Sequence, residues 1–410
     1  MAIRRKVTDN YSFCLIVYEI MIKYVWNLHL EESMLVKFKV TGFKNFEKEL
    51  VLDLSNPGKY DFNTDLVKNK TINKGIIYGP NGSGKSNLGE ALFDIENNLL
   101  ALDNNLNFTS PFSGFYKNTI TNQNPEFEYI FQFGNDTVIY HYIKDQPNYV
   151  LEEDLSVNGK KVLEYHNDKS KIICSNPFAK KLNFVNMTDG LSPLLYIYRT
   201  IKLEKDDPIS KLFNFVKGML WFRCLNKGNE FKGYKESAEI IENKIINENK
   251  VKDFQNFLEE TANLKYDIKV NKTGRINPLT GEEEKILVAQ FSNRNYPLVS
   301  LLSTGTQALE LFYYWSLCFS DITFLFIDEF DAFYHFELSS KIIKILNSNN
   351  NFQSFVTTHN TTLMSNELMR PDCLFIIDKN EIKPVCDLTQ KELRQAHNLE
   401  KIYRAEGFSF

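Results

Sequence analysis

Hydrophobic and polar positions alternate with a period of two in the first regular part of the chain. Residues 35–54 follow this alternation, with an interruption at Thr41 and Gly42, which predicts a β-hairpin or a pair of strands. Two similar hairpin patterns follow, with turns at residues 134–136 and at Asn158-Gly159. We therefore expect an antiparallel β lobe from about residue 126 to residue 175.

A different spacing of apolar residues, typical of amphipathic helices, follows the expected lobe. Residues 208–224 fit one helix, and residues 234–264 fit one or two more. No heptad pattern persists, so we expect a helical insertion that packs on the rest of the protein rather than a long coiled coil. Residues 266–271 and 285–294 then predict two strands on either side of a turn at 278–281.

The sequence G-P-N-G-S-G-K-S follows a short apolar run and precedes a helical pattern. Strand, glycine-rich loop and helix in this order are the context that a phosphate-binding P-loop requires. Glycines let backbone N–H groups point at phosphate oxygens, and the helix adds its positive end. Lys85 would reach the β- and γ-phosphates, and the Ser86 hydroxyl would bind Mg²⁺. The predicted nucleotide-binding residues are Gly79, Pro80, Asn81, Gly82, Ser83, Gly84, Lys85, Ser86 and Asn87.

A second apolar run, at residues 322–327, ends on Asp328 and Glu329. A run of this length is what a strand buried on both faces needs, and ligands bind at the carboxyl ends of parallel strands. Asp328 is placed to hold Mg²⁺, directly or through water. Glu329 is placed to act as a general base on the attacking water.

Two histidines are further candidates. His359 ends the next buried-looking strand, after Thr357 and Thr358, and this context favours a γ-phosphate contact over a structural role. His335 lies between the acidic pair and an amphipathic helix. For His335 the structural and the functional interpretation both stay open.

Composition and charge restrict the class of protein, its partners and its location, but they do not identify a reaction. The chain has 410 residues, 43% hydrophobic and 24% charged, with a net charge of -4, which is ordinary for a globular protein and gives no support for a nucleic-acid partner. A local basic patch remains possible. The cysteines are scattered without a C-x-x-C pair, so we expect reduced thiols and a cytoplasmic protein. Residues 11–30 are apolar but carry Glu19 and Lys23, so we expect no membrane span.

Four parts are expected along the chain. Residues 1–33 would be an accessory extension or the product of an upstream start. The first half of the nucleotide-binding domain, called the head below, would span residues 34–204 and include the β lobe. The helical insertion would span residues 205–265. The second half of the head would span 266–410.

The ordered motifs resemble those of ABC-type ATPase heads, as in RecF, SMC-like and OLD-like proteins. More closely, they resemble the compact AAA/ABC ATPases of bacterial anti-phage defence operons, including the RloA-, AbiL- and AriA-type (PARIS) proteins. The matching segments are NGSGKSN (81–87), LSTGTQALEL (302–311), IDEFDAFYH (327–335), TTHN (357–360) and LRQAHNLEKIYRAEGF (393–408).

This resemblance implies an α/β P-loop NTPase with a mostly parallel core sheet, an antiparallel β lobe and a helical insertion. It implies ATP and Mg²⁺ as cofactors, and a signature segment that acts in trans on ATP held by a second copy. The signature residues would be Ser303, Thr304, Gly305 and Thr306. The segment reads S-T-G-T rather than S-G-G-Q, a variant that the defence ATPases show. Gln123 and Gln132 are candidates for the Q-loop glutamine, and Lys44 for a basic residue near the nucleotide.

Three functions remain open from the sequence. The first is a slow, regulated ATPase that works as a homo-oligomeric switch in an abortive-infection system and controls a separate, nuclease-like effector. Few residues follow His359 and no other acidic cluster stands out, so we expect cleavage chemistry to come from another chain. The second is a RecF-like DNA-repair ATPase, and the third is a scaffold in which ATP only stabilises assembly.

Overall fold

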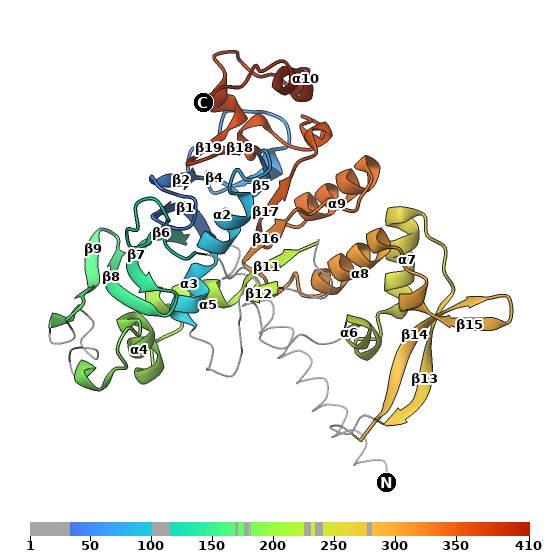
Figure 1. Cartoon of the computed structure of the whole chain (residues 1–410), viewed down its shortest axis with the longest axis horizontal. Coiled ribbons are helices and arrows are strands. Elements are labelled where there is room, and N and C mark those ends of the chain that lie inside the picture. Colours follow the sequence, from blue (N-terminus) through green and yellow to red (C-terminus); the bar gives the residue numbers. More distant parts are fainter. Residues whose placement is uncertain are drawn as a thin grey trace, which may run out of the picture.

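The structure is a computed structural model. It describes residues 33–100, 115–168, 171–175, 180, 182–224, 231–233, 241–276 and 281–410. Figure 1 shows a core sheet in the middle of the molecule, a β lobe on one side, and helices α6–α8 with a small sheet on the other. The expectation for residues 1–33 falls almost entirely outside the described residues.

The core sheet has seven strands, in the order β12-β11-β16-β17-β5-β18-β19. The five inner strands are parallel to one another, and the two edge strands are antiparallel to their neighbours. The inner strands are buried along nearly their whole length, as expected for a sheet covered on both faces. The strands are β5 (Lys74–Tyr78), β11 (Met219–Arg223), β12 (Phe231–Gly233), β16 (Phe324–Asp328), β17 (Gln353–Thr358), β18 (Leu374–Asp378) and β19 (Glu381–Pro384).

The helix predicted over residues 208–224 is a partial error. Helix α5 (Pro208–Lys217) ends before Gly218, and β11 follows it as a strand of the core sheet. A Cβ on Gly218 would lie 2.7 Å from Thr323 Cγ2 and 3.1 Å from the Asp321 carbonyl oxygen, just before the neighbouring strand β16, so the chain turns here at very close approach. The all-apolar run Met219–Phe222 is a strand because it pairs with β16, a contact that local periodicity does not reveal.

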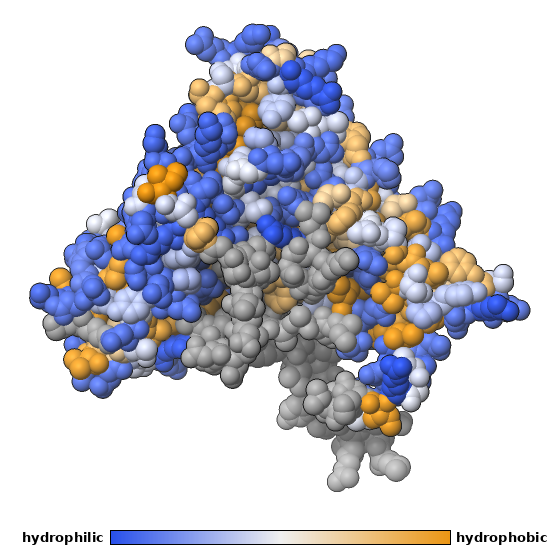
Figure 2. All heavy atoms as spheres, in the orientation of Figure 1, coloured by the Kyte–Doolittle hydropathy of each residue, from blue (hydrophilic) through white to orange (hydrophobic). Residues whose placement is uncertain are grey.

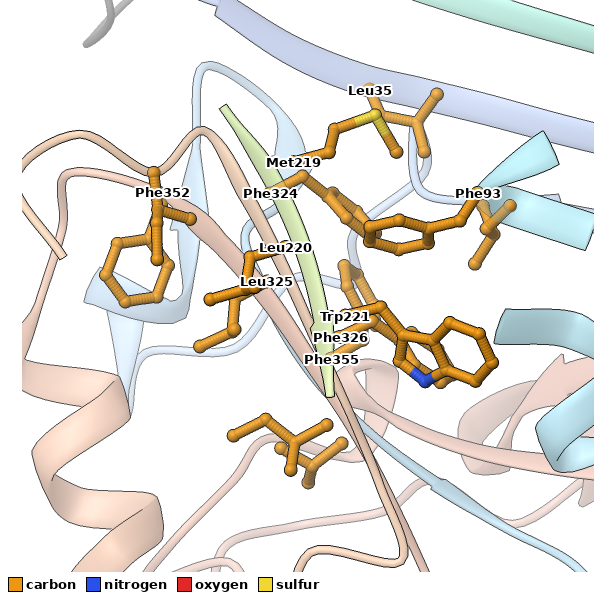
Figure 3. Packing of buried hydrophobic residues seen from close by; sticks show 14 of the residues in the cluster. Leu35, Phe93, Met219, Leu220, Trp221, Phe324, Leu325, Phe326, Phe352 and Phe355 are labelled. Carbon is orange, nitrogen blue, oxygen red and sulfur yellow. The ribbon is translucent and has the colours of Figure 1, made fainter. Parts of the chain in front are cut away.

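Helices cover both faces of the core sheet. Figure 3 shows Trp221, Phe324 and Phe326 on the side of Phe93, with Leu220 and Leu325 on the opposite side. The ring centroids of Phe93 and Trp221 are 6.1 Å apart. A Cβ on Gly89 would lie 2.8 Å from Phe326, so this glycine lets α2 pack closely on β16. The first face carries α2 (Lys85–Leu92) and α3 (Asp94–Leu99); α8 (Thr304–Ser316) and α9 (Phe336–Ser348) pack on the second.

The β lobe is a seven-stranded antiparallel sheet, in the order β10-β9-β8-β7-β6-β1-β2. The two hairpins predicted between residues 126 and 175 are confirmed as β6–β7 and β8–β9. The strand pair predicted at 35–54 also exists, and it extends the same sheet through pairing of β1 with β6. The strands are β1 (Ser33–Thr41), β2 (Leu50–Asp53), β6 (Glu126–Phe133), β7 (Asp136–Gln146), β8 (Tyr149–Val157), β9 (Lys160–His166) and β10 (Ile173–Cys174).

Buried polar contacts join the β lobe to the core. Gln353, at the start of β17, accepts a hydrogen bond from Leu35 N–H (2.6 Å) and donates to the carbonyl oxygens of Leu35 (3.0 Å) and Ile72 (3.1 Å). On the other side of the lobe, Lys144 of β7 forms a buried ion pair with Asp94 of α3 at 2.5 Å. These buried polar contacts therefore fix the β lobe to the core sheet and to α3.

The remaining part contains two helices and a small sheet. The strands predicted at 266–271 and 285–294 are confirmed as β13 and β14, and β15 completes an antiparallel sheet. Most of β13 is exposed, and Figure 2 shows apolar residues gathered on this side of an otherwise largely polar face. The elements are α6 (Ile241–Asn247), α7 (Val251–Ala262), β13 (Ile268–Ile276), β14 (Glu283–Phe291) and β15 (Arg294–Pro297).

Short elements complete the fold. They are β3 (Val67–Lys68), β4 (Thr71–Ile72), α4 (Pro193–Thr200), α10 (Leu399–Arg404) and the 3-10 helices Thr64–Leu66, Phe184–Asn186, Leu298–Ser300, Thr361–Leu363, Pro371–Cys373 and Val385–Leu388. Within the described residues, no helix is long and apolar enough to span a bilayer. The boundaries expected at 204 and 265 stay a prediction.

We predict that Gln353→Leu lowers the free energy of unfolding by about 3 kcal/mol, because the buried backbone groups of Leu35 and Ile72 lose a partner. Urea denaturation followed by circular dichroism measures the change. The control is Gln123→Leu at an exposed loop position, where we expect a change within about 0.5 kcal/mol. Equal effects of the two variants would contradict this role of Gln353.

Candidate active site

The glycine-rich loop joins β5 to α2 in the predicted order. Gly82 and Gly84 have φ angles of 77° and 104°, a conformation that favours glycine. A Cβ on Gly79 would lie 2.6 Å from the Ile377 carbonyl oxygen, so this position is closed to larger residues. A Cβ on Gly82 would meet nothing within 4 Å, which leaves that side of the loop open to a ligand.

Lys85 is bound by its own loop. Its Nζ donates to the carbonyl oxygens of Gly79 (2.8 Å) and Pro80 (3.2 Å) and lies 3.5 Å from His359 Nδ1. Burial lowers the pKa of Lys85, and the negative charges of Asp328 and Glu329 partly oppose this effect. The ammonium group therefore lies inside the loop, where an incoming phosphate could replace the carbonyl oxygens.

Lys44 and Asn45, in the segment after β1, contact the P-loop and its helix α2. A Cβ on Gly84 would lie 2.7 Å from the side chain of Asn45, which accepts a hydrogen bond from Asn87 of α2. Lys44 forms an ion pair with Glu90 of α2, so it lies beside the P-loop helix. Its proposed contact with nucleotide stays a prediction.

Asp328 is fully buried at the end of β16. Its Oδ1 accepts a hydrogen bond from Thr357 Oγ1 at 2.7 Å, and its Oδ2 accepts one from Arg223 Nε at 2.8 Å. Thr357 also accepts a hydrogen bond from Glu329 N–H at 2.7 Å. One threonine thus fixes both members of the acidic pair.

Glu329 has a φ of 50°, which is unusual for a residue other than glycine. Such strain persists where neighbouring contacts hold it, and here the hydrogen bond from Glu329 N–H to Thr357 does so. The chain therefore turns sharply after β16, and the side chains of Asp328 and Glu329 point to different places. Asp328 stays in the interior, while Glu329 lines an open pocket.

This pocket has a volume of about 450 Å³ and is lined by Asn81, Glu329, Asp331, Ala332, His359 and Asn360. It therefore joins the P-loop to the ends of β16 and β17. Burial lowers the pKa of His359, and the charge of Lys85 adds to this effect, which favours the neutral imidazole. Burial raises the pKa of Asp331, whose Oδ1 accepts a hydrogen bond from Thr358 at 2.7 Å.

The predicted signature residues lie elsewhere. Ser303 is the N-cap of α8, and its Oγ accepts a hydrogen bond from Thr306 N–H at 3.3 Å. Ser303 and Thr304 are exposed, and a Cβ on Gly305 would lie 2.9 Å from the Phe333 carbonyl oxygen. Within the part of the chain that the structure describes, these residues do not line the pocket.

Three other candidates also lie away from the pocket lining of the described chain. His335 occupies the N-cap position of α9 without a capping hydrogen bond from its side chain. The Gln132 amide donates to Gly134 O and accepts from Thr137 within its own hairpin, and Gln123 packs next to Gly42. Their predicted roles stay predictions.

Sequence reasoning missed Arg223, Asp331 and Asn45, and gave Thr357 no role. Arg223 follows the apolar run Met219–Phe222, so interpreting that run as a strand would have placed an arginine at the carboxyl edge of the sheet. Asp331 lies two residues after Glu329, inside a motif that was already recognised. No local pattern pointed to Asn45.

The structure also brings together an acidic cluster that the sequence did not reveal. Ligand atoms of Asp154, Glu164 and His166 lie within 4.8 Å of one another on the β lobe. Lys161 Nζ lies 3.7 Å from Asp154 and 3.1 Å from Glu164, and His166 contacts Glu152 and Glu164. Lys161 is thus a cation of the same sheet that already pairs with two of these carboxylates.

The residues of the glycine-rich loop and of the acidic pair fit a nucleoside triphosphate with Mg²⁺. Ser86 and Asp328 offer hydroxyl and carboxylate oxygens, the ligands that Mg²⁺ prefers. Ser83 Oγ is buried in the loop without a hydrogen-bond partner among the described residues. Gly82 leaves the loop open on its outer side. A loop with these features can surround the phosphate groups of a nucleotide.

Several solved structures resemble this chain at low identity. The SMC head domain from Thermotoga maritima has 18% identity and a TM-score of 0.40, with 86% of this chain and 98% of that chain covered. An SMC head with an extended coiled coil, bound to the C-terminal domain of ScpA from Pyrococcus furiosus, has 13% identity and a TM-score of 0.41 (86% and 95% covered). The recombination mediator protein RecF with ATP has 14% identity and a TM-score of 0.37 (86% and 99% covered).

No curated protein matches the chain. A family profile does match, over residues 76–172 and 225–365, which together make up more than half of the chain. The matched residues include the P-loop, the signature segment, the acidic pair and His359. The protein therefore belongs to the family described as "AAA domain, putative AbiEii toxin, Type IV TA system".

Proposed function

We propose that this protein is an ABC-type ATPase switch whose complete catalytic site forms between two copies of the chain. The proposal is supported by the finding that the predicted site residues lie at two separate places on the chain. The P-loop, Glu329 and His359 meet at one pocket, whereas the signature segment is exposed at the start of α8. Membership of an AAA-domain family supports a nucleotide as the ligand.

The P-loop would bind the triphosphate. Backbone N–H groups of the loop and the N-terminal end of α2 would face the phosphates. Lys85 would exchange the carbonyl oxygens of Gly79 and Pro80 for phosphate oxygens. Ser86 and Asp328 would hold Mg²⁺, which when bound neutralises phosphate charge.

Glu329 would position the attacking water. Its strained backbone and the hydrogen bond of its N–H to Thr357 hold the carboxylate at the pocket. A general base of this kind must lie within hydrogen-bond reach of the water that it activates. A neutral His359, next to Lys85, would contact the γ-phosphate.

The signature segment would complete the site of a second copy. Ser303 caps α8, a helix of 13 residues that begins at Thr304, and both Ser303 and Thr304 are exposed. Such a helix end favours a phosphate. Because this end does not line the chain's own pocket within the described residues, we assign it to the nucleotide of a partner copy. ATP binding would then favour an engaged state, and hydrolysis would release it.

We predict that Glu329→Gln lowers ATP turnover by a factor on the order of 100 or more, because a general base typically contributes that much. ATP binding should survive, so the variant should accumulate as an ATP-bound dimer or higher oligomer. Phosphate release and light scattering with and without ATP measure the two effects. Lys85→Ala is the control that should neither bind ATP nor assemble. Wild-type turnover by Glu329→Gln would instead favour a different base or a non-hydrolysing scaffold.

The biological role that we propose is anti-phage defence with a separate, nuclease-like effector. The description of the matching family, which names a toxin of a toxin–antitoxin system, supports this setting. The motifs at residues 302–311 and 327–335 support it through their resemblance to defence ATPases. The net charge of -4 gives no support for DNA as the main partner.

We expect that cells carrying this gene with its neighbours resist phage, and that Lys85→Ala abolishes the resistance because nucleotide can no longer bind. Plaque counts measure the effect. The matched control is Lys265→Ala on the surface between α7 and β13, which should retain wild-type resistance. Unchanged resistance in the Lys85→Ala strain would contradict the proposal. ATPase activity stimulated several-fold by DNA alone would favour a DNA-repair role instead.

A further inference from the structure

Arg223 occupies a defined position beside the acidic pair. It is the last residue of β11, and it lies opposite Asp328 in the parallel pairing of β11 with β16. Figure 3 shows β11 packed against the core through Trp221. The Arg223 side chain is 20% exposed, whereas Asp328 has no exposed surface. The guanidinium therefore lies between the buried carboxylate and solvent.

Both carboxylate oxygens of Asp328 are engaged. Thr357 donates to Oδ1, and Arg223 donates to Oδ2. A buried carboxylate is costly without a counter-ion, and Arg223 is the counter-ion of Asp328. The same carboxylate is the candidate ligand for Mg²⁺, so a metal ion bound there would compete with the guanidinium for Oδ2.

We propose that Arg223 is a positioning residue that holds Asp328 in the nucleotide-free protein and releases it when Mg²⁺–nucleotide is loaded. Arg223 thereby sets the concentration of Mg²⁺ that nucleotide binding requires. The inference rests on the proposed function only in naming Mg²⁺ and ATP as the ligands.

The variant Arg223→Gln tests this role in the full-length protein. Loss of the competing charge should lower the Mg²⁺ concentration for half-maximal binding of a fluorescent ATP analogue by about fivefold. Binding of the same analogue in EDTA should stay within about twofold, because Arg223 acts through Asp328. Arg275→Gln, on exposed β13, removes the same charge and should leave the Mg²⁺ requirement unchanged.

A thermal measurement gives a second readout that does not depend on nucleotide. Without metal, Arg223→Gln should melt below the wild type because Asp328 loses its counter-ion. MgCl₂ alone should then raise the Tm of the variant by at least about 2 °C more than that of the wild type. Arg223→Lys keeps the charge but loses the guanidinium geometry, so its Mg²⁺ midpoint should lie between the two.

Two outcomes would overturn the inference. An unchanged Mg²⁺ midpoint in Arg223→Gln would show that the pair is only structural. Weaker analogue binding by the same factor with Mg²⁺ and with EDTA would make Arg223 a phosphate ligand instead. If the wild type itself bound no ATP analogue, the proposed function would fail, while the thermal shift with MgCl₂ would still test the Arg223–Asp328 pair.

Discussion

Asp328 is a carboxylate without exposed surface, and such a charge is stable only where neighbouring groups bind it. Its partners come from the two adjacent strands: Thr357 from β17 and Arg223 from β11. Three parallel strands are thereby tied together at their carboxyl ends, where ligands bind in sheets of this kind. Thr357 extends the arrangement to Glu329, and β17 continues to His359. The geometry of the site thus follows from how one buried charge is satisfied.

The same arrangement explains which parts could be predicted from the sequence. The P-loop and the strand that ends at Asp328 carry local signals: glycines at fixed spacing and an apolar run before two acids. The hairpins of the β lobe were likewise predicted from alternation and turn residues. Their neighbours in space were not, because sheet order depends on pairing between distant segments. For this reason the attachment of β1 to β6 became visible only in the structure.

Arg223 is the clearest example of a residue whose position could not be predicted from the sequence. Only Lys217 and Gly218 separate the apolar positions of α5 from the run Met219–Phe222, so periodicity alone extended the helix over a strand. Gly218 and the pairing with β16 decide the outcome, and neither is a periodic signal. Asn45 was missed for a similar reason, since it reaches Gly84 and Asn87 from a loop about 40 residues away in sequence. Local motifs pointed to the candidate catalytic and binding residues, and tertiary contacts revealed the residues that hold them in place.

In the proposed function, one chain holds the nucleotide and a second chain closes on it. Mixing two inactive variants tests this most directly. Lys85→Ala disables the P-loop, and Ser303→Arg disables the signature segment. In a symmetric dimer with a shared site, an equimolar mixture should recover about a quarter of wild-type ATP turnover, since half of the dimers carry one intact site out of two. If the mixture stayed as inactive as the separate variants, although the two variants formed mixed dimers in the presence of ATP, the shared site would be contradicted.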